Sequence, residues 1–158
     1  MTKQTPNPEL FLIHIDPKDK AEVSQRLAEA GTLEELDENN LLLRVTTQAT
    51  SPETQWREVA NLAGSLATVQ PVLIDEKGQT LFPTGDVTVR FPKKPTAKRL
   101  KDFAAKYGLE LRDRNEFVPE QVAFKTDRYL PDVLQEIDTD EDIQTAWPNT
   151  RSRYQRLS

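Results

Sequence analysis

Residues 87–149 decide the fold, and they read VTVRFPKKPTAKRLKDFAAKYGLELRDRNEFVPEQVAFKTDRYLPDVLQEIDTDEDIQTAWPN. An alternating strand, Val87–Phe91, is followed by the polar turn Pro92–Thr96 and then by an amphipathic helix over Ala97–Gly108. One face of that helix carries apolar side chains at spacings of three and four residues, namely Leu100, Phe103, Ala104 and Tyr107. Gly108 is typical of a helix C-cap.

Four further elements are expected after this helix. The pattern predicts strands over about 109–113 and 121–126, separated by residues 115–120, and a helix over about 128–137. The acidic turn Asp138–Asp142 leads into a last strand, 143–147, which Pro148 and Asn149 are expected to close. The resulting order, β-α-β-β-α-β, is that of a ferredoxin-like unit.

The first half of the chain shows the same order of elements. Strands are expected at 10–16, 32–36, 41–46 and 66–74, and helices at 20–30 and 51–63. We interpret the match as an internal duplication. The predicted fold is therefore α+β, with two tandem ferredoxin-like (βαββαβ) domains built on antiparallel sheets.

The predicted domains are 1–84 and 85–149, linked through residues 81–85. The first begins with a loose arm, residues 1–9, and a basic flexible tail, residues 150–158, follows the second. Residues 1–84 hold 7 basic and 13 acidic side chains, whereas residues 85–158 hold 14 and 13. The net negative charge of the protein therefore comes from its first half.

Composition narrows the possible functions. The chain of 158 residues is 36% hydrophobic and has no cysteine, which excludes disulfides and thiolate metal sites. The net charge of −5 argues against nucleic acid as a general partner. No apolar run is long enough to span a membrane, and residues 1–9 lack an apolar signal core, so a cytoplasmic protein with no membrane partner is expected.

Catalytic and metal-binding patterns are weak. His14 is the single histidine and lies mid-strand, so a Ser-His-Asp set cannot be assembled. Residues 138–142 are acidic, but a calcium loop that starts at Asp138 would need glycine and glutamate where Ile143 and Asn149 stand. The five glycines are scattered and form no phosphate-binding motif. We expect no enzyme activity, no metal and no cofactor.

The second half resembles a subtilase propeptide, the peptidase-inhibitor domain that precedes many subtilisin-like serine proteases. The resemblance rests on the strand Val87–Phe91, on Leu100, Phe103 and Tyr107-Gly108-Leu109, and on the closing stretch 140–149. Trp147 departs from the family, in which an acidic residue is common at that place.

This resemblance implies a non-enzymatic protein-binding module, an inhibitor and intramolecular chaperone of a subtilisin-like serine protease acting in cis or in trans. It implies that the segment after the last strand enters the protease cleft: Asn149, Thr150, Arg151, Ser152, Arg153 and Tyr154. It also implies that the sheet contacts the protease through Val122, Phe124, Thr145 and Trp147.

Two other functions remain open from the sequence. One is a scaffold or assembly protein that reuses the propeptide fold without a protease. The other is a small-molecule sensor built across the two ferredoxin-like halves.

Overall fold

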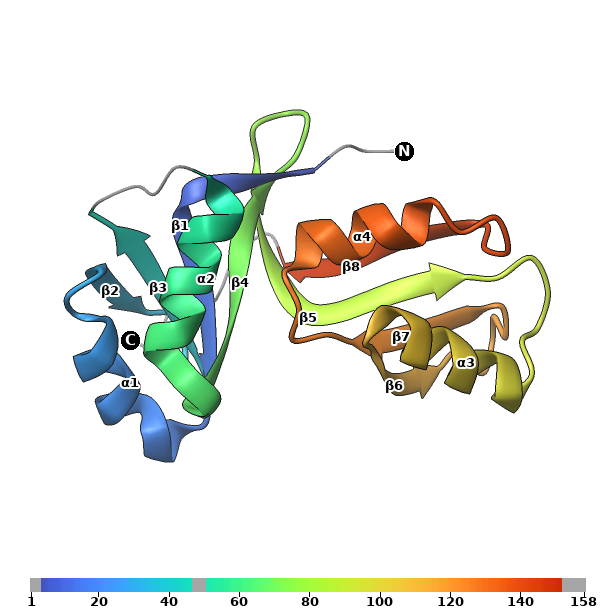
Figure 1. The fold of residues 1–158 in the computed structure, drawn as a ribbon, viewed down its shortest axis with the longest axis horizontal. Coiled ribbons are helices and arrows are strands. Elements are labelled where there is room, and N and C mark those ends of the chain that lie inside the picture. Colours follow the sequence, from blue (N-terminus) through green and yellow to red (C-terminus); the bar gives the residue numbers. More distant parts are fainter. Residues whose placement is uncertain (1–3, 47–50, 152–158) are drawn as a thin grey trace. The chain divides into compact units, whose positions relative to one another are not determined.

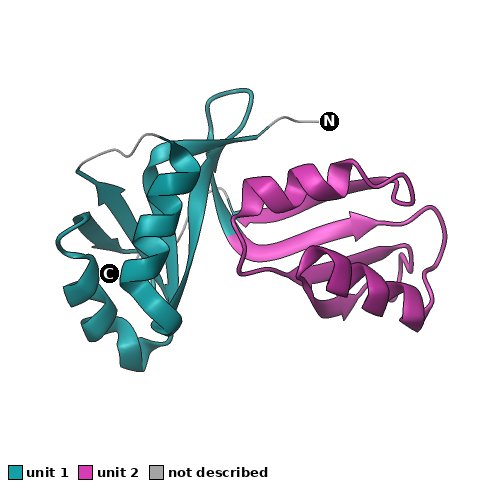
Figure 2. Ribbon diagram, viewed as in Figure 1, with its two compact units in different colours: residues 1–83, 151–158 teal, residues 84–150 magenta. Residues whose placement is uncertain are grey.

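The computed structural model describes residues 4–46 and 51–151 of the chain (Figure 1). In chain order its elements are β1 (Thr5–Ile15), η1 (Pro17–Asp19), α1 (Lys20–Leu27), β2 (Gly31–Glu35), β3 (Asn40–Val45), α2 (Pro52–Ala63), η2 (Gly64–Leu66), β4 (Ala67–Ile74), β5 (Thr80–Arg90), α3 (Ala97–Tyr107), β6 (Glu110–Arg114), β7 (Gln121–Lys125), α4 (Leu130–Asp138) and β8 (Thr145–Arg151). They divide into unit 1, residues 1–83 and 151–158, and unit 2, residues 84–150 (Figure 2).

Unit 1 has the strand order β2-β3-β1-β4, with antiparallel pairing throughout. Alternation along β1 explains its core, because successive side chains point to opposite faces of the sheet. Phe11, Ile13 and Ile15 pack on the helix side, together with Val23 and Leu27 of α1. The opposite face is apolar as well, with a second buried cluster of Leu10, Leu12, Leu36 and Val72.

Unit 2 has the strand order β8-β5-β7-β6, the same arrangement as in unit 1. Val87 and Val89 of β5 and Val122 and Phe124 of β7 are buried, and the ring of Phe103 in α3 lies 5.3 Å from that of Phe124. Helices α3 and α4 therefore cover this side of the sheet (Figure 1). The other side carries the alternate residues of β5 and β7, which include Thr88, Gln121 and Ala123.

The helix ends follow the capping signals in the sequence. The side chain of Ser51 accepts a hydrogen bond from Thr54 N, and that of Thr96 accepts one from Arg99 N. Helix α3 ends at Gly108, which has φ +66° in the left-handed region that glycine tolerates.

The predicted fold class is confirmed: the chain is α+β, and each unit has the βαββαβ order. The division of the chain into domains at 1–84 and 85–149 stays a prediction.

Three segments expected outside regular structure lie in strands. Thr5 and Pro6, expected in a loose arm, pair with Ile74 and Leu73. Residues 81–85, expected as a linker, belong to β5, whose Leu81 pairs with Leu73. Strand β8 extends to Arg151, past the Pro148 that was expected to close it. Proline lacks an N–H but is tolerated in a strand at the edge of a sheet, and β8 pairs with β5 alone among the described strands.

Candidate functional site

A pocket of about 410 Å³ lies at the start of α3, and we name it the α3 pocket. Its lining comes from the turn between β5 and α3, the first turn of α3 and the turn before β8. It is lined by Phe91, Pro92, Lys93, Lys94, Pro95, Thr96, Arg99, Glu141 and Asp142. The lining thus combines basic and acidic side chains with a phenyl ring and two prolines.

Arg99 is the central cation of the α3 pocket. Its guanidinium carbon lies 5.5 Å from the ring centroid of Phe91 and 5.4 Å from that of Phe103. These two rings meet edge to face at 5.3 Å. The aromatic faces attract the cation and fix the plane of the guanidinium.

One nitrogen of this guanidinium is buried without a hydrogen bond. Nη2 of Arg99 has no hydrogen-bond partner among the described residues. The carboxylate Oδ2 of Asp142 lies 4.0 Å from it, on a side chain that is 83% exposed. Such a distance allows electrostatic attraction but no hydrogen bond, so the donor is left without an acceptor.

The acidic side of the pocket is held in place by Asp140. Its Oδ2 accepts a 2.6 Å hydrogen bond from the hydroxyl of Tyr107, and its Oδ1 accepts one from Asp142 N at 2.9 Å. Nζ of Lys106 lies 3.8 Å from the same carboxylate, whose side chain is 5% exposed. Asp140 therefore fixes the turn that carries Asp142.

Both ends of the Tyr107–Asp140 hydrogen bond have shifted pKa values. Burial, followed by the hydrogen bond to Asp140, raises the pKa of Tyr107 to about 12. Burial acts to raise the pKa of Asp140 as well, but the hydrogen bonds from Tyr107 and Asp142 N outweigh it. The pKa of Asp140 is therefore lowered. The pair is accordingly a neutral phenol bound to a carboxylate over the ordinary pH range.

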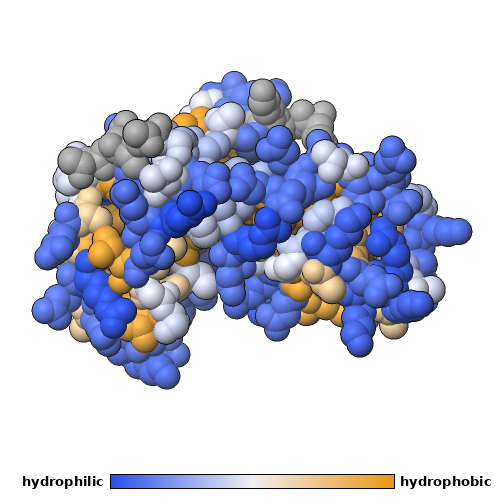
Figure 3. All heavy atoms as spheres, in the orientation of Figure 1, coloured by the Kyte–Doolittle hydropathy of each residue, from blue (hydrophilic) through white to orange (hydrophobic). Residues whose placement is uncertain are grey.

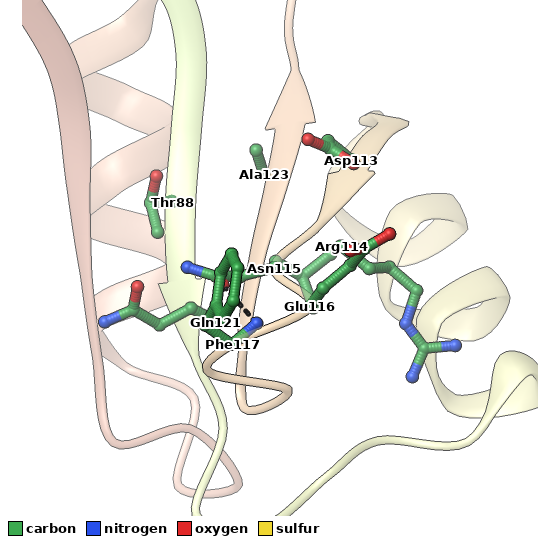
Figure 4. Close-up of a pocket in the computed structure, with 9 residues that line it drawn as sticks. Thr88, Asp113, Arg114, Asn115, Glu116, Phe117, Gln121 and Ala123 are labelled. Carbon is green, nitrogen blue, oxygen red and sulfur yellow. Dashed lines mark hydrogen bonds between the residues drawn. The ribbon is translucent and has the colours of Figure 1, made fainter.

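A second pocket of about 410 Å³ lies on the side of the unit 2 sheet that faces away from the helices, and we name it the sheet-face pocket (Figure 4). Thr88 of β5 and Gln121 and Ala123 of β7 lie along it, and the loop between β6 and β7 borders it with Asn115 and Phe117. The surface drawn in Figure 3 is mostly hydrophilic, with apolar patches between the polar residues.

The residues predicted to contact a partner through the sheet do not share one environment. Val122 and Phe124 are 1% and 0% exposed and belong to the core beneath the helices. Thr145 and Trp147 are half-buried in β8. Val122 and Phe124 point inward because Val87 and Val89, their neighbours in β5, face the helices too.

The segment expected to enter a protease cleft begins inside the sheet. Asn149, Thr150 and Arg151 are residues of β8. The carbonyl oxygen of Asn149 accepts a hydrogen bond from Thr84 Oγ1, and its Oδ1 accepts one from Thr88 Oγ1 at 2.7 Å. The remaining predicted cleft residues, Ser152, Arg153 and Tyr154, lie outside the described residues.

Within residues 4–46 and 51–151, no group of three or more histidine or acidic side chains could hold a metal ion. His14 is exposed on β1, where its Nδ1 lies 3.2 Å from Oδ1 of Asn40. In the same part of the chain, no helix is both long and apolar enough to cross a membrane.

Among the comparisons with known proteins, only the search of solved structures finds similar chains. No family model matches the chain, and no curated protein matches it. The chain is similar to a solved structure named as that of a glycine cleavage system transcriptional repressor, with 16% identity, a TM-score of 0.30, and coverage of 97% of this chain and 99% of that chain. At this level of identity the likeness assigns neither a family nor a function to this chain.

The resemblance to subtilase propeptides is corrected by these findings. No propeptide model matches, and the similar structure is named as a repressor rather than as a protease prosegment. The protease inhibitor and intramolecular chaperone functions, and the subtilisin-like protease as partner, are therefore wrong. The resemblance rested on short apolar spacings that any ferredoxin-like unit of this size can share.

Arg99 and Phe117 are pocket residues that were not predicted from the sequence. A signal for Arg99 was present in Lys93-Lys94-Pro95-Thr96, because two lysines precede a helix whose first turn has no acidic residue. A signal for Phe117 was an aromatic residue within a short polar turn, residues 115–120. Neither pattern shows which pocket the side chain borders, since that depends on how the strands pair.

Proposed function

We propose that unit 2 binds a small organic acid in the α3 pocket and that the chain is a non-catalytic ligand-binding protein. The observation that carries this proposal is the buried Nη2 of Arg99, which has no hydrogen-bond partner. A guanidinium N–H forms strong hydrogen bonds to carboxylates. Leaving such a buried donor unmet is costly, so a ligand oxygen that meets it gains affinity.

The surrounding charges favour an anion at this end of the pocket. Lys93 and Lys94 are exposed on the turn that leads into α3. No acidic residue stands in the first turn of α3 to offset the partial positive charge of the helix end. Together with Arg99, these groups make the helix side of the pocket electropositive.

The other residues of the lining restrict the class of anion. Glu141 and Asp142 would repel a ligand that carries several negative charges, such as a nucleoside triphosphate. Phe91, Pro92 and Pro95 offer apolar surface to a carbon skeleton. The volume of about 410 Å³ lies within the range of known small-molecule sites. A monocarboxylate with an apolar body fits this combination best.

The side chains in the pocket support the proposed non-catalytic role. They supply cations, two carboxylates and the hydroxyl of Thr96, which caps Arg99 N. The lining contains no histidine or other base beside a nucleophile, which is the arrangement that covalent catalysis requires.

The test compares monocarboxylic acids with their primary amides in thermal unfolding and calorimetric titrations of the intact chain. We expect acids to raise the melting temperature and amides not to, with about 2.7 kcal/mol of stabilisation at a ligand concentration of 100 times Kd. Inorganic phosphate and ATP should bind more weakly than the acids.

Arg99→Met is the diagnostic variant, because it keeps an unbranched apolar side chain against the two rings and removes the charge. Its matched control is Arg57→Met on α2, which removes an arginine that is 65% exposed and outside the pocket. Loss of acid binding in the first variant alone supports the proposal. Equal stabilisation by acids and amides, or full acid binding by Arg99→Met, contradicts it.

A further inference from the structure

The side of the unit 1 sheet opposite α1 and α2, which we name the far face, is buried. Both helices pack on the other side of the sheet, through residues such as Leu27 and Val59. Nevertheless, Leu12 and Val72 of the far face are only 4% and 0% exposed. Gln70, which pairs with Leu12, is 5% exposed, although glutamine is a residue type that is mostly exposed.

The residues of the far face do not explain their own burial. They all belong to the strands of the sheet or to the turn after β2, and they are Leu10, Leu12, Leu36 and Val72, with Leu42 and Phe82 packed against them. Side chains on one face of a sheet project side by side, so their outer ends stay in contact with water unless a further layer packs over them. Neither α1 nor α2 supplies this layer, so another segment must do so.

The C-terminal segment, residues 152–158, starts from the part of β5 that borders the far face. Strand β8 ends at Arg151, which belongs to unit 1. Two residues earlier, the carbonyl oxygen of Asn149 accepts a hydrogen bond from Thr84 Oγ1, and Thr84 follows Phe82 by two residues in β5. Beyond Arg151, six extended residues reach about 20 Å. Four strands about 4.8 Å apart are about 14 Å across, so the segment is long enough to cross the sheet of unit 1.

The composition of this segment suits such a position. It reads SRYQRLS, in which Tyr154 and Leu157 are the apolar side chains and Arg153 and Arg156 are the charged ones. A tyrosine is well suited to the far face, because its ring is apolar and its hydroxyl can remain in water or meet a polar group such as Gln70.

The charges favour the same pairing. The segment carries two arginines and no acidic residue, whereas residues 1–84 hold 7 basic and 13 acidic side chains. On the far face, Glu34 is half-buried and pairs with Leu42 of β3. Arg44 of the same face is bound to Glu9 at 3.2 Å, so its charge is balanced. The far face therefore attracts a basic segment.

We infer that residues 152–158 bind the far face of unit 1 within the same molecule, with Tyr154 and Leu157 on the apolar cluster. Attachment to β8 keeps the segment at a local concentration in the millimolar range, which a second molecule in dilute solution does not reach. The inference is independent of the α3 pocket, which belongs to unit 2, and of any ligand that binds there.

The experiment measures thiol labelling, which the absence of natural cysteine makes specific. Leu12→Cys places a single thiol on the far face, and Ile13→Cys places it on the helix side of the same strand. We expect Tyr154→Ser/Leu157→Ser, made in each full-length variant, to speed labelling of Leu12→Cys at least tenfold and to leave that of Ile13→Cys unchanged. Gln155→Ala, a polar neighbour, should alter neither rate. Circular dichroism and melting temperature verify that each variant is folded.

Four results would overturn the inference. Rapid labelling of Leu12→Cys with the segment intact would show that the far face is open. Labelling that stays slow after Tyr154→Ser/Leu157→Ser would show that another part of the chain covers it. Equal acceleration at Ile13→Cys would reveal a general loosening of unit 1, and protection that grows with protein concentration would assign the cover to a second copy.

A second pair of positions keeps the test decisive if Leu12→Cys does not fold. Val72→Cys and Val69→Cys lie on the far face and on the helix side of β4, respectively, and change the side-chain volume little. Labelling of Val72→Cys should then respond to the substitutions in the segment, and that of Val69→Cys should not. The same four results would count against the inference.

Discussion

The hydroxyl of Tyr107 donates a 2.6 Å hydrogen bond to Oδ2 of Asp140, joining the last turn of α3 to the segment before β8. Both side chains are buried, with relative exposures of 5% for Tyr107 as a residue and 5% for the Asp140 side chain. Asp140 also accepts a hydrogen bond from the backbone amide of Asp142. The Tyr107–Asp140 hydrogen bond therefore supports the segment that brings Asp142 to the α3 pocket.

Tyr107→Phe removes this hydrogen bond while keeping the ring against Phe103. We expect the free energy of unfolding at pH 7 to fall by about 1.5–3 kcal/mol, the range for hydrogen bonds to charged groups. Urea unfolding measures the change. Asp138→Asn, which alters an exposed carboxylate at the end of α4, should change stability far less. Equal losses in the free energy of unfolding of the two variants would show that the buried hydrogen bond contributes no more to stability than an exposed carboxylate.

The same bond predicts how stability depends on pH. The lowered pKa of Asp140 means that its contribution is present above the unfolded value of about 3.9 and is lost as pH falls through the folded pKa. The raised pKa of Tyr107 means that its contribution is complete below about pH 10 and is lost as pH rises towards 12. Denaturant unfolding over pH 2–12 should therefore show both losses in the wild type. In Tyr107→Phe the alkaline loss from this residue should vanish and the acid loss should shrink. A profile unchanged by the substitution would contradict this assignment.

Gly31→Ala should be severely destabilising. A Cβ at this position would lie 1.9 Å from the carbonyl oxygen of Arg44, an atom of the paired strand that cannot move without separating β2 from β3. We expect a loss of about 3 kcal/mol or more in chemical denaturation, as for other substitutions that force a backbone shift.

Gly78→Ala is the matched control for that substitution. No atom lies within 4 Å of its added Cβ, but the residue has φ +79°. Alanine at position 78 would therefore cost only the free energy of the left-handed conformation, about 1–2 kcal/mol. If the control were the more damaging of the two, close backbone approach would not be the reason for Gly31.

Asn149→Ala tests whether the closing segment belongs to the sheet. The side chain of Asn149 accepts a 2.7 Å hydrogen bond from the hydroxyl of Thr88. Removing this hydrogen bond should lower the free energy of unfolding by about 1 kcal/mol. Hydrogen exchange should become faster in β8 and along the facing side of β5, while β1 and β3 of unit 1 keep their protection. Unchanged exchange in β8 would mean that this contact does not hold the strand.

Hydrophobic periodicity was sufficient to predict both βαββαβ units, because the buried faces of α3 and β7 carry regular apolar spacings. It failed at strand ends. Pro148 predicts the end of the last strand, yet an edge strand tolerates a residue without an N–H. Thr5 and Pro6 lack the alternation of a strand, and their pairing with β4 is a consequence of tertiary structure.

The candidate site was harder to predict than the fold. Periodicity shows that Phe103 and Tyr107 face inward, but not that Arg99 lies over the ring of Phe91. Such a contact depends on how the turn Pro92–Thr96 folds back, which the spacing of apolar residues does not encode. The sequence likewise does not predict that Phe117 is exposed, because an apolar residue in a short turn can also fold inward.

The pairing of β5 with β8 bears on how the protein is made. Thr88 and the Asn149 that it contacts are 61 residues apart. At the usual rates of translation, β5 leaves the ribosome roughly 3–12 s before its outer neighbour. During that interval one edge of β5 has no partner, and it is open to pairing with other nascent chains on the same messenger RNA. Synonymous codons between residues 90 and 145 could therefore alter the yield of folded protein without changing its sequence.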